Sequence, residues 1–161
     1  MIQRRQTIFM FLTAIISALL FFTPLVSFDA ESNMRFAVLG MQNPIDALTL
    51  SKSYTWPLIA LTVLMTVLPI YTILIYKKRK LQVKLCHLNM LLNIAFICMI
   101  FLYYTNDIQK VIVSVDGYSG QLDVAYLYGM LLPLVNLVLE ILAVRGIKKD
   151  IELLKSVDRL R

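Results

Sequence analysis

The sequence predicts an all-α membrane protein, a four-transmembrane-helix bundle with a small β cap formed by the two extracytoplasmic loops. Hydrophobic residues make up 59% of the 161 residues and charged residues only 16%, and the mean hydropathy is +0.74. A soluble domain of this length has about a quarter of its residues charged. Four apolar stretches are each long enough to cross the roughly 30 Å hydrocarbon core of a bilayer. Basic residues gather on one side of these stretches, which fixes an orientation.

The four apolar stretches define the expected membrane spans. They are Thr7–Phe28, Trp56–Tyr76, Leu85–Tyr104 and Val124–Val144. The first three contain no Asp, Glu, Lys or Arg, and the fourth contains Glu140 alone. No stretch alternates between polar and apolar residues as a barrel strand must, so helices are expected. We treat residues 1–161 as a single four-helix transmembrane domain.

The distribution of charge predicts the orientation of these helices. Both ends of the chain and the link between the second and third spans hold 13 of the 16 basic residues against three acidic ones, a net charge of +10. The segments Asp29–Thr55 and Thr105–Asp123 have a net charge of −3. The positive-inside rule therefore places both termini and the basic tail 145–161 in the cytoplasm. The sequence pI of 9.4 indicates this topology and not nucleic-acid binding.

The two extracytoplasmic loops are expected to form a small sheet. Met34–Leu39, Leu48–Ser51 and Lys110–Val115 have the composition of short strands, and Asn43-Pro44 is typical of a turn. A sheet that joins both loops would pair strand edges that otherwise stay exposed at the membrane surface.

The cytoplasmic tail carries apolar residues at helical spacing. They are Ile147, Ile151, Leu154 and Val157. One interpretation is an amphipathic helix that bends at Gly146 and lies on the membrane surface. The other is a fourth helix that continues into water without a bend.

The residues needed for known catalytic or metal chemistry are not grouped in this sequence. A single histidine excludes a site built on a His pair, and five dispersed glycines form no phosphate-binding loop. Cys86 and Cys98 are about 18 Å apart along one helix, too far for a disulfide. We therefore expect no catalytic residue, no metal and no cofactor, and we expect that the protein is not an enzyme.

Polar residues inside the spans form the candidate site. Glu140 and Asn136 lie one turn apart in the fourth span, and Asn89 and Asn93 lie one turn apart in the third. If the two helices are antiparallel neighbours, Asn89 is level with Glu140 and Asn93 with Asn136, and His87 lies at a similar depth. This polar seam either holds two helices together or forms a proton or ion relay; we favour the structural interpretation.

Two further features indicate contacts of the helices. In the first span, Thr13, Ala14, Ser17 and Ala18 form a face of small residues, which is typical of close helix packing. Basic residues at the cytoplasmic end are candidate contacts for anionic lipid headgroups, although the positive-inside rule alone explains them. These candidates are Arg4, Arg5, Lys77, Lys78, Arg79, Lys80, Lys148 and Lys149.

Both ends of the chain resemble a known family. The opening Met1-Ile2-Gln3-Arg4-Arg5-Gln6-Thr7 and the basic stretches 144–150 and 156–161 are similar to those of an uncharacterised family of Bacteroidota membrane proteins, domain of unknown function 4293. The resemblance implies the inner membrane of a Gram-negative cell, with the β cap in the periplasm. It implies no reaction and no catalytic residues.

These observations favour a non-enzymatic integral inner-membrane protein, an accessory or structural subunit of a larger membrane complex. Its expected partners are the lipid bilayer and other inner-membrane proteins, with no nucleic acid. The alternative is a small transporter or proton-coupled channel component that uses Glu140 with His87, Asn89, Asn93 and Asn136. An enzyme that acts on lipid ranks third because no nucleophile–base pair is present.

Overall fold

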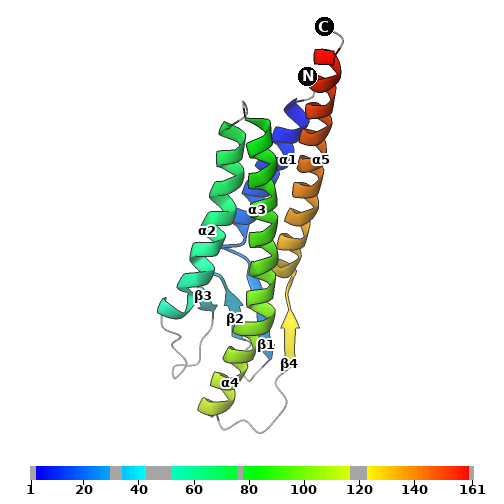
Figure 1. The fold of residues 1–161 in the computed structure, drawn as a ribbon. Coiled ribbons are helices and arrows are strands. Elements are labelled where there is room, and N and C mark those ends of the chain that lie inside the picture. Colours follow the sequence, from blue (N-terminus) through cyan, green and yellow to red (C-terminus); the bar gives the residue numbers. More distant parts are fainter. Residues whose placement is uncertain (1–2, 30–33, 43–51, 76–77, 117–122, 160–161) are drawn as a thin grey trace.

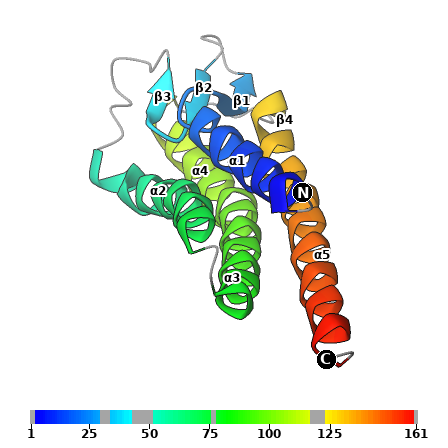
Figure 2. The same ribbon diagram turned by 90° about the horizontal axis from the view of Figure 1, so that it is seen from above.

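Four long helices run side by side, with a small sheet at one end (Figure 1). The computed structural model describes residues 3–29, 34–42, 52–75, 78–116 and 123–159. The long helices are α1 (Gln3–Leu19), α2 (Lys52–Leu74), α3 (Arg79–Cys98) and α5 (Leu131–Arg159). Helix α1 packs on α2 and α5, and α3 packs on the same two helices, so the order around the bundle is α1, α2, α3, α5 (Figure 2).

Within the described parts of the chain, three helical segments are apolar and long enough to cross a membrane. They are Thr55–Leu74, Arg79–Lys110 and Tyr128–Leu153. Large apolar side chains such as Leu64, Leu91 and Val138 are exposed on their outer faces, as expected where the surrounding solvent is lipid. The expectation of apolar helices typical of a membrane protein is confirmed. The first expected span, Thr7–Phe28, differs, since its helix is a shorter apolar one over Gln6–Leu19.

The expected span Thr7–Phe28 is wrong over its last part. Helix α1 ends at Leu19, and strand β1 (Pro24–Asp29) follows after a short turn. Pro24 has no backbone N–H, and its ring disfavours helical geometry at the residue before it. The hydrophobic run continues through the proline, but the helix does not.

The sheet has four antiparallel strands in the order β3-β2-β1-β4. Strands β2 (Met34–Ala37) and β3 (Gly40–Gln42) form a tight hairpin, in which Gly40 has a φ of 135° that favours glycine. Strand β4 (Asp123–Tyr126) pairs with β1 on its other side. The strand expected at Met34–Leu39 is thus confirmed over Met34–Ala37. The strand expected at Leu48–Ser51 lies outside the described residues.

Strand β4 displaces the start of the last long helix. The expected span began at Val124, but residues 123–126 are extended and η2 (Tyr128–Met130) is a single 3-10 turn before α5. Strand β1 thus comes from the end of the first predicted span and β4 from the start of the fourth, whereas β2 and β3 come from the first loop. It joins two parts of the chain that are nearly 100 residues apart, since Phe28 pairs with Val124.

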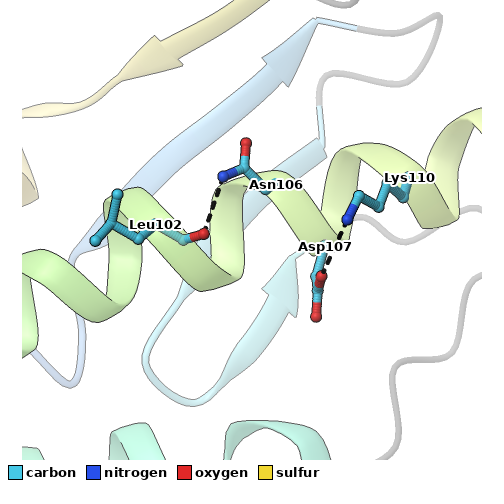
Figure 3. Close-up of polar contacts among 4 residues, drawn as sticks. All are labelled: Leu102, Asn106, Asp107 and Lys110. Atoms are coloured by element: carbon cyan, nitrogen blue, oxygen red, sulfur yellow. Dashed lines mark hydrogen bonds and ion pairs between the residues drawn. The ribbon is translucent and has the colours of Figure 1, made fainter.

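The strand expected at Lys110–Val115 is wrong, because this segment is helical. Helix α3 continues through the π-helical turn η1 (Met99–Tyr104) into α4 (Thr105–Asp116). The Asn106 side-chain amide donates to the Leu102 carbonyl oxygen at 2.9 Å, and Lys110 Nζ lies 4.0 Å from Asp107 Oδ1 (Figure 3). These contacts join residues three or four positions apart, which are neighbours on a helix surface.

The sequence of α4 explains the error. Its β-branched residues suggested a strand, but its apolar residues recur every three or four positions, as on one face of a helix. These residues are Ile108, Val111, Ile112 and Val115. Ile108 is fully buried in the core beside the sheet, so helical periodicity outweighs β propensity here.

Helix α5 runs without a break from Leu131 to Arg159, straight through Gly146. Of the two interpretations of the tail, the continuous helix is therefore the observed one. Gly146 permits a close approach of α1, because a Cβ there would lie 2.9 Å from Gln6 Cγ. Ile147 is fully buried at this crossing, so the first part of the tail packs against the bundle.

Candidate functional site

Glu140 is buried in the bundle on the face of α5 that packs against α3. Only 3% of its surface is exposed. The side-chain amides of Asn89 and Asn93 both donate hydrogen bonds to Glu140 Oε1, and the bond from Asn93 is 3.2 Å long. Helices α3 and α5 are therefore joined by two hydrogen bonds to the Glu140 carboxylate, one from Asn89 and one from Asn93.

Asn136 takes a different partner from the one expected. It was placed level with Asn93, but its side-chain amide donates to the Ser17 hydroxyl on α1 at 2.8 Å. Asn93 instead also donates to the Asn89 carbonyl oxygen, one turn earlier in its own helix, at 3.3 Å. The polar seam, defined by Glu140, Asn89, Asn93, Asn136 and Ser17, thus joins three helices.

His87 does not belong to the seam. Its ring is exposed, and Nδ1 lies 2.6 Å from the Val83 carbonyl oxygen in the same helix. Asn89 and Asn93 are four positions apart and share a helix face, whereas His87 precedes Asn89 by two positions, a rotation of roughly 200°. Position along the two helices puts the asparagines level with Glu140, which they contact, but it does not give the direction of the histidine.

A small cavity lies beside Glu140. Its volume of about 10 Å³ is close to the space that one water molecule needs. Thr13, Thr72 and Asn89 are among the residues that line it. Glu140 Oε2 has no hydrogen-bond partner among the described residues, and neither do the side-chain oxygens of the three seam asparagines. The hydroxyls of Thr13 and Thr72 donate to carbonyl oxygens of their own helices, so their protons are already used. The seam side-chain atoms without a partner among the described residues are therefore all oxygens.

A second set of polar contacts lies at the end of the bundle that holds the chain termini. Gln6 on α1 donates to Asp150 Oδ2 at 2.6 Å, and Arg79 Nη1 donates to the Asp150 carbonyl oxygen at 3.4 Å. Gln82 Nε2 donates to the Thr72 carbonyl oxygen at 3.0 Å. Sequence analysis missed Gln6, Gln82 and Asp150. Ile147 and Ile151 are apolar residues at helical spacing in the tail. Asp150 lies three positions after Ile147, so the same pattern indicated that Asp150 would face the bundle.

The candidate lipid contacts lie at this same end, where both termini and the α2–α3 link are found (Figure 1). Arg79 is half-buried, whereas Lys78, Lys80, Lys148 and Lys149 are exposed. Arg4 and Arg5 belong to the first turns of α1, and Lys77 lies outside the described residues. The structure thus places the described candidates around one end of the bundle, and Arg79 lines a groove there.

Comparisons with known proteins agree with the resemblance seen at the two ends of the chain. Residues 2–160 match the family described as a domain of unknown function (DUF4293). Neither a comparison with curated proteins nor one with solved structures gave a match. Because the match extends over almost the entire sequence, the chain belongs to the DUF4293 family.

Proposed function

We propose that this chain is a non-enzymatic protein of the inner membrane, with four spans and both termini in the cytoplasm, that acts as an accessory or structural subunit of a larger membrane complex. The observation that carries the proposal is that the polar side chains of the seam form hydrogen bonds between helices. Asn89 and Asn93 join α3 to α5, and Asn136 joins α5 to α1. Polar side chains at membrane depth are costly unless paired, and these pairs hold the bundle together.

The surroundings of α1 support the count of four spans. Its apolar part, Gln6–Leu19, rises only about 21 Å, and the hydrophobic residues Leu20, Phe21 and Phe22 extend it toward the sheet. Helix α1 also packs between α2 and α5, so a bilayer that surrounds these neighbours surrounds α1 as well. The basic end and the acidic end of the bundle then set the orientation by the positive-inside rule, and the family resemblance supports a Gram-negative inner membrane with the sheet in the periplasm.

The outer surface of the bundle supports a role in assembly. Large apolar side chains are exposed on every long helix, among them Phe11 on α1, Leu74 on α2 and Leu91 on α3. Membrane helices associate through packing of such surfaces and through small residues. A second membrane protein could therefore dock on an outer face without disturbing the seam.

A second candidate, a proton-coupled component of a transporter or channel, is favoured by one observation. Glu140 Oε2 is buried without a partner among the described residues, next to a cavity of about one water. A carboxyl group beside a water site is a common element of proton relays in membranes. His87, which was expected to contribute to such a relay, points out of the bundle, so the relay would depend on Glu140 and the asparagines.

Substitutions of Glu140 separate the two candidates. Gln keeps the size of Glu and can accept the hydrogen bonds of Asn89 and Asn93, but it cannot carry a proton. Leu removes the acceptor, so the Asn89 amide loses its partner and Asn93 keeps only its bond to the Asn89 carbonyl oxygen. Leaving a buried amide unsatisfied costs about 1–3 kcal/mol. The native protein is purified in mild detergent, its co-purifying proteins are quantified, and proton flux is measured in proteoliposomes.

The subunit proposal expects a stoichiometric partner that co-purifies with the wild type and with Glu140→Gln, and less so with Glu140→Leu. It also expects no proton flux above that of empty liposomes. A monodisperse protein without partners, whose proton flux is lost in Glu140→Gln while the fold is retained, would overturn it in favour of the relay.

A further inference from the structure

An amphipathic groove lies between α1 and the corner where α2 ends and α3 begins. Its volume is about 730 Å³, within the range of about 300–1,000 Å³ that is usual for sites of small ligands. One wall is apolar and is formed almost entirely by α1. The apolar lining residues are Ile8, Met10, Phe11, Leu12, Ile15 and Ile73.

The groove is polar at one end only. Gln6, Arg79 and Gln82 line this end, and their side chains are fixed by the hydrogen bonds to Asp150 and to the Thr72 carbonyl oxygen. From Gln6 to Ile15 the groove follows α1 for about 14 Å. Its polarity therefore runs along the membrane normal, from a fixed polar end at the membrane surface to an apolar part in the hydrocarbon core.

The polar end carries an excess of positive charge. Arg79 is half-buried in the groove, and the exposed Lys78 and Lys80 flank it in the sequence. The carboxylate of Asp150 opposes them but is buried behind Gln6, to which it is hydrogen-bonded. The exposed Lys148 and Lys149 precede Asp150 on α5, and the exposed Glu152 follows it, so basic groups still outnumber acidic ones at this end.

We propose that this groove binds one anionic phospholipid, with its phosphate at Arg79 and an acyl chain along α1. A guanidinium presents a planar fork of N–H donors that matches phosphate oxygens, and the Asp150 carbonyl oxygen holds this fork at the polar end. The apolar wall has the length and composition for a hydrocarbon chain. The proposal rests on the membrane placement given under "Proposed function", but not on the role as a subunit.

The test uses the full-length protein in vesicles that contain equal amounts of phosphatidylglycerol and phosphatidylcholine. The protein is recovered by flotation, extracted in mild detergent and analysed for retained lipid. We expect phosphatidylglycerol to be enriched about fivefold over phosphatidylcholine, the ratio that one basic side chain near an anionic surface supplies. Arg79→Gln should reduce the ratio to about one. Lys80→Gln, an equal charge change at an exposed position outside the groove, should retain most of the enrichment.

A third variant tests the apolar part of the groove. Ile15→Trp places a larger side chain on the wall and should lower the retention of both lipids without changing helix content by circular dichroism. Equal retention of the two lipids by the wild type overturns the proposal. Equal loss in Arg79→Gln and Lys80→Gln also overturns it, since the basic surface as a whole would then attract the lipid. A wild-type protein that does not float with the vesicles contradicts the membrane placement itself.

Discussion

Asn136 on α5 donates a 2.8 Å hydrogen bond to the hydroxyl of Ser17 on α1, and neither side chain is exposed. Ser17 belongs to the face of small residues that the sequence indicated, and Thr13 and Ala14 on the same face are buried as well. Small side chains let the two helix backbones approach closely. The short helix α1 is therefore tied to the longest helix of the bundle by a polar contact in the interior.

The contact between Ser17 and Asn136 should have a measurable coupling energy. Ser17→Ala leaves the Asn136 amide without its acceptor, so we expect the free energy of unfolding in detergent to fall. A double-mutant cycle with Asn136→Ala should give a coupling of about 0.6 kcal/mol and at most about 1.7 kcal/mol, the range measured between membrane helices. Ser156→Ala is the control, since this exposed serine bonds only to its own helix. A coupling of zero would show that the hydrogen bond does not stabilise the packing of α1 on α5.

Two glycines should differ in how strongly a substitution by Ala lowers stability. A Cβ at Gly129 would lie 2.3 Å from the Pro24 carbonyl oxygen, and backbone in the β1 strand cannot easily move aside. We expect Gly129→Ala to lower the free energy of unfolding by about 1–3 kcal/mol, as overpacking does. Thermal unfolding followed by circular dichroism measures this change.

Gly146→Ala is the matched control for Gly129→Ala. Its Cβ would lie 2.9 Å from Gln6 Cγ, a side-chain atom that can shift more easily than backbone, and Ala favours a helix over Gly by about 0.8–1.0 kcal/mol. We therefore expect a stability close to that of the wild type. If Gly129→Ala proves as mild as Gly146→Ala, strand β1 does not approach η2 as closely as described.

The packing of the sheet on the helices depends on Phe36. This fully buried side chain of β2 stacks on Tyr104 at the junction of α3 and α4, with 5.4 Å between ring centroids. Phe36→Ala should lower the free energy of unfolding by about 3–5 kcal/mol. Phe22→Ala removes the same ring from a side chain that is 75% exposed and should change stability by no more than about 0.5 kcal/mol. Chemical denaturation compares the two, and equal effects would contradict a sheet that packs on the bundle.

The long helices could be predicted from the sequence because a continuous apolar run of about 20 residues has few alternatives. The run alone, however, did not show where the first helix ends. The hydrophobic stretch continues past Leu19 into β1, whose Leu25, Val26 and Phe28 are as buried as any helix residue. High hydropathy indicates that a segment is buried but not whether it is a helix or a strand. Here Pro24 lacks the backbone N–H that a continuing helix needs, and a strand follows instead.

The candidate site was predictable in its depth but only partly in its partners. Two asparagines one turn apart share a helix face by geometry, so their approach to Glu140 required only that α3 and α5 be antiparallel neighbours. The partner of Asn136 depended on where α1 packs, and a single sequence does not contain that information. The same holds for Gln6 and Asp150, which are 144 residues apart in the chain.

The orientation of the chain in the membrane is the central claim, and cysteine labelling in cells tests it most directly. In a background of Cys86→Ala and Cys98→Ala, Lys110→Cys reports on α4, where this side chain is 79% exposed, and Lys148→Cys reports on the exposed surface at the opposite end. After the outer membrane is permeabilised, a membrane-impermeant maleimide should label Lys110→Cys but label Lys148→Cys only once the inner membrane is opened. Labelling of Lys148→Cys from the outside in intact inner membranes would contradict the proposed topology.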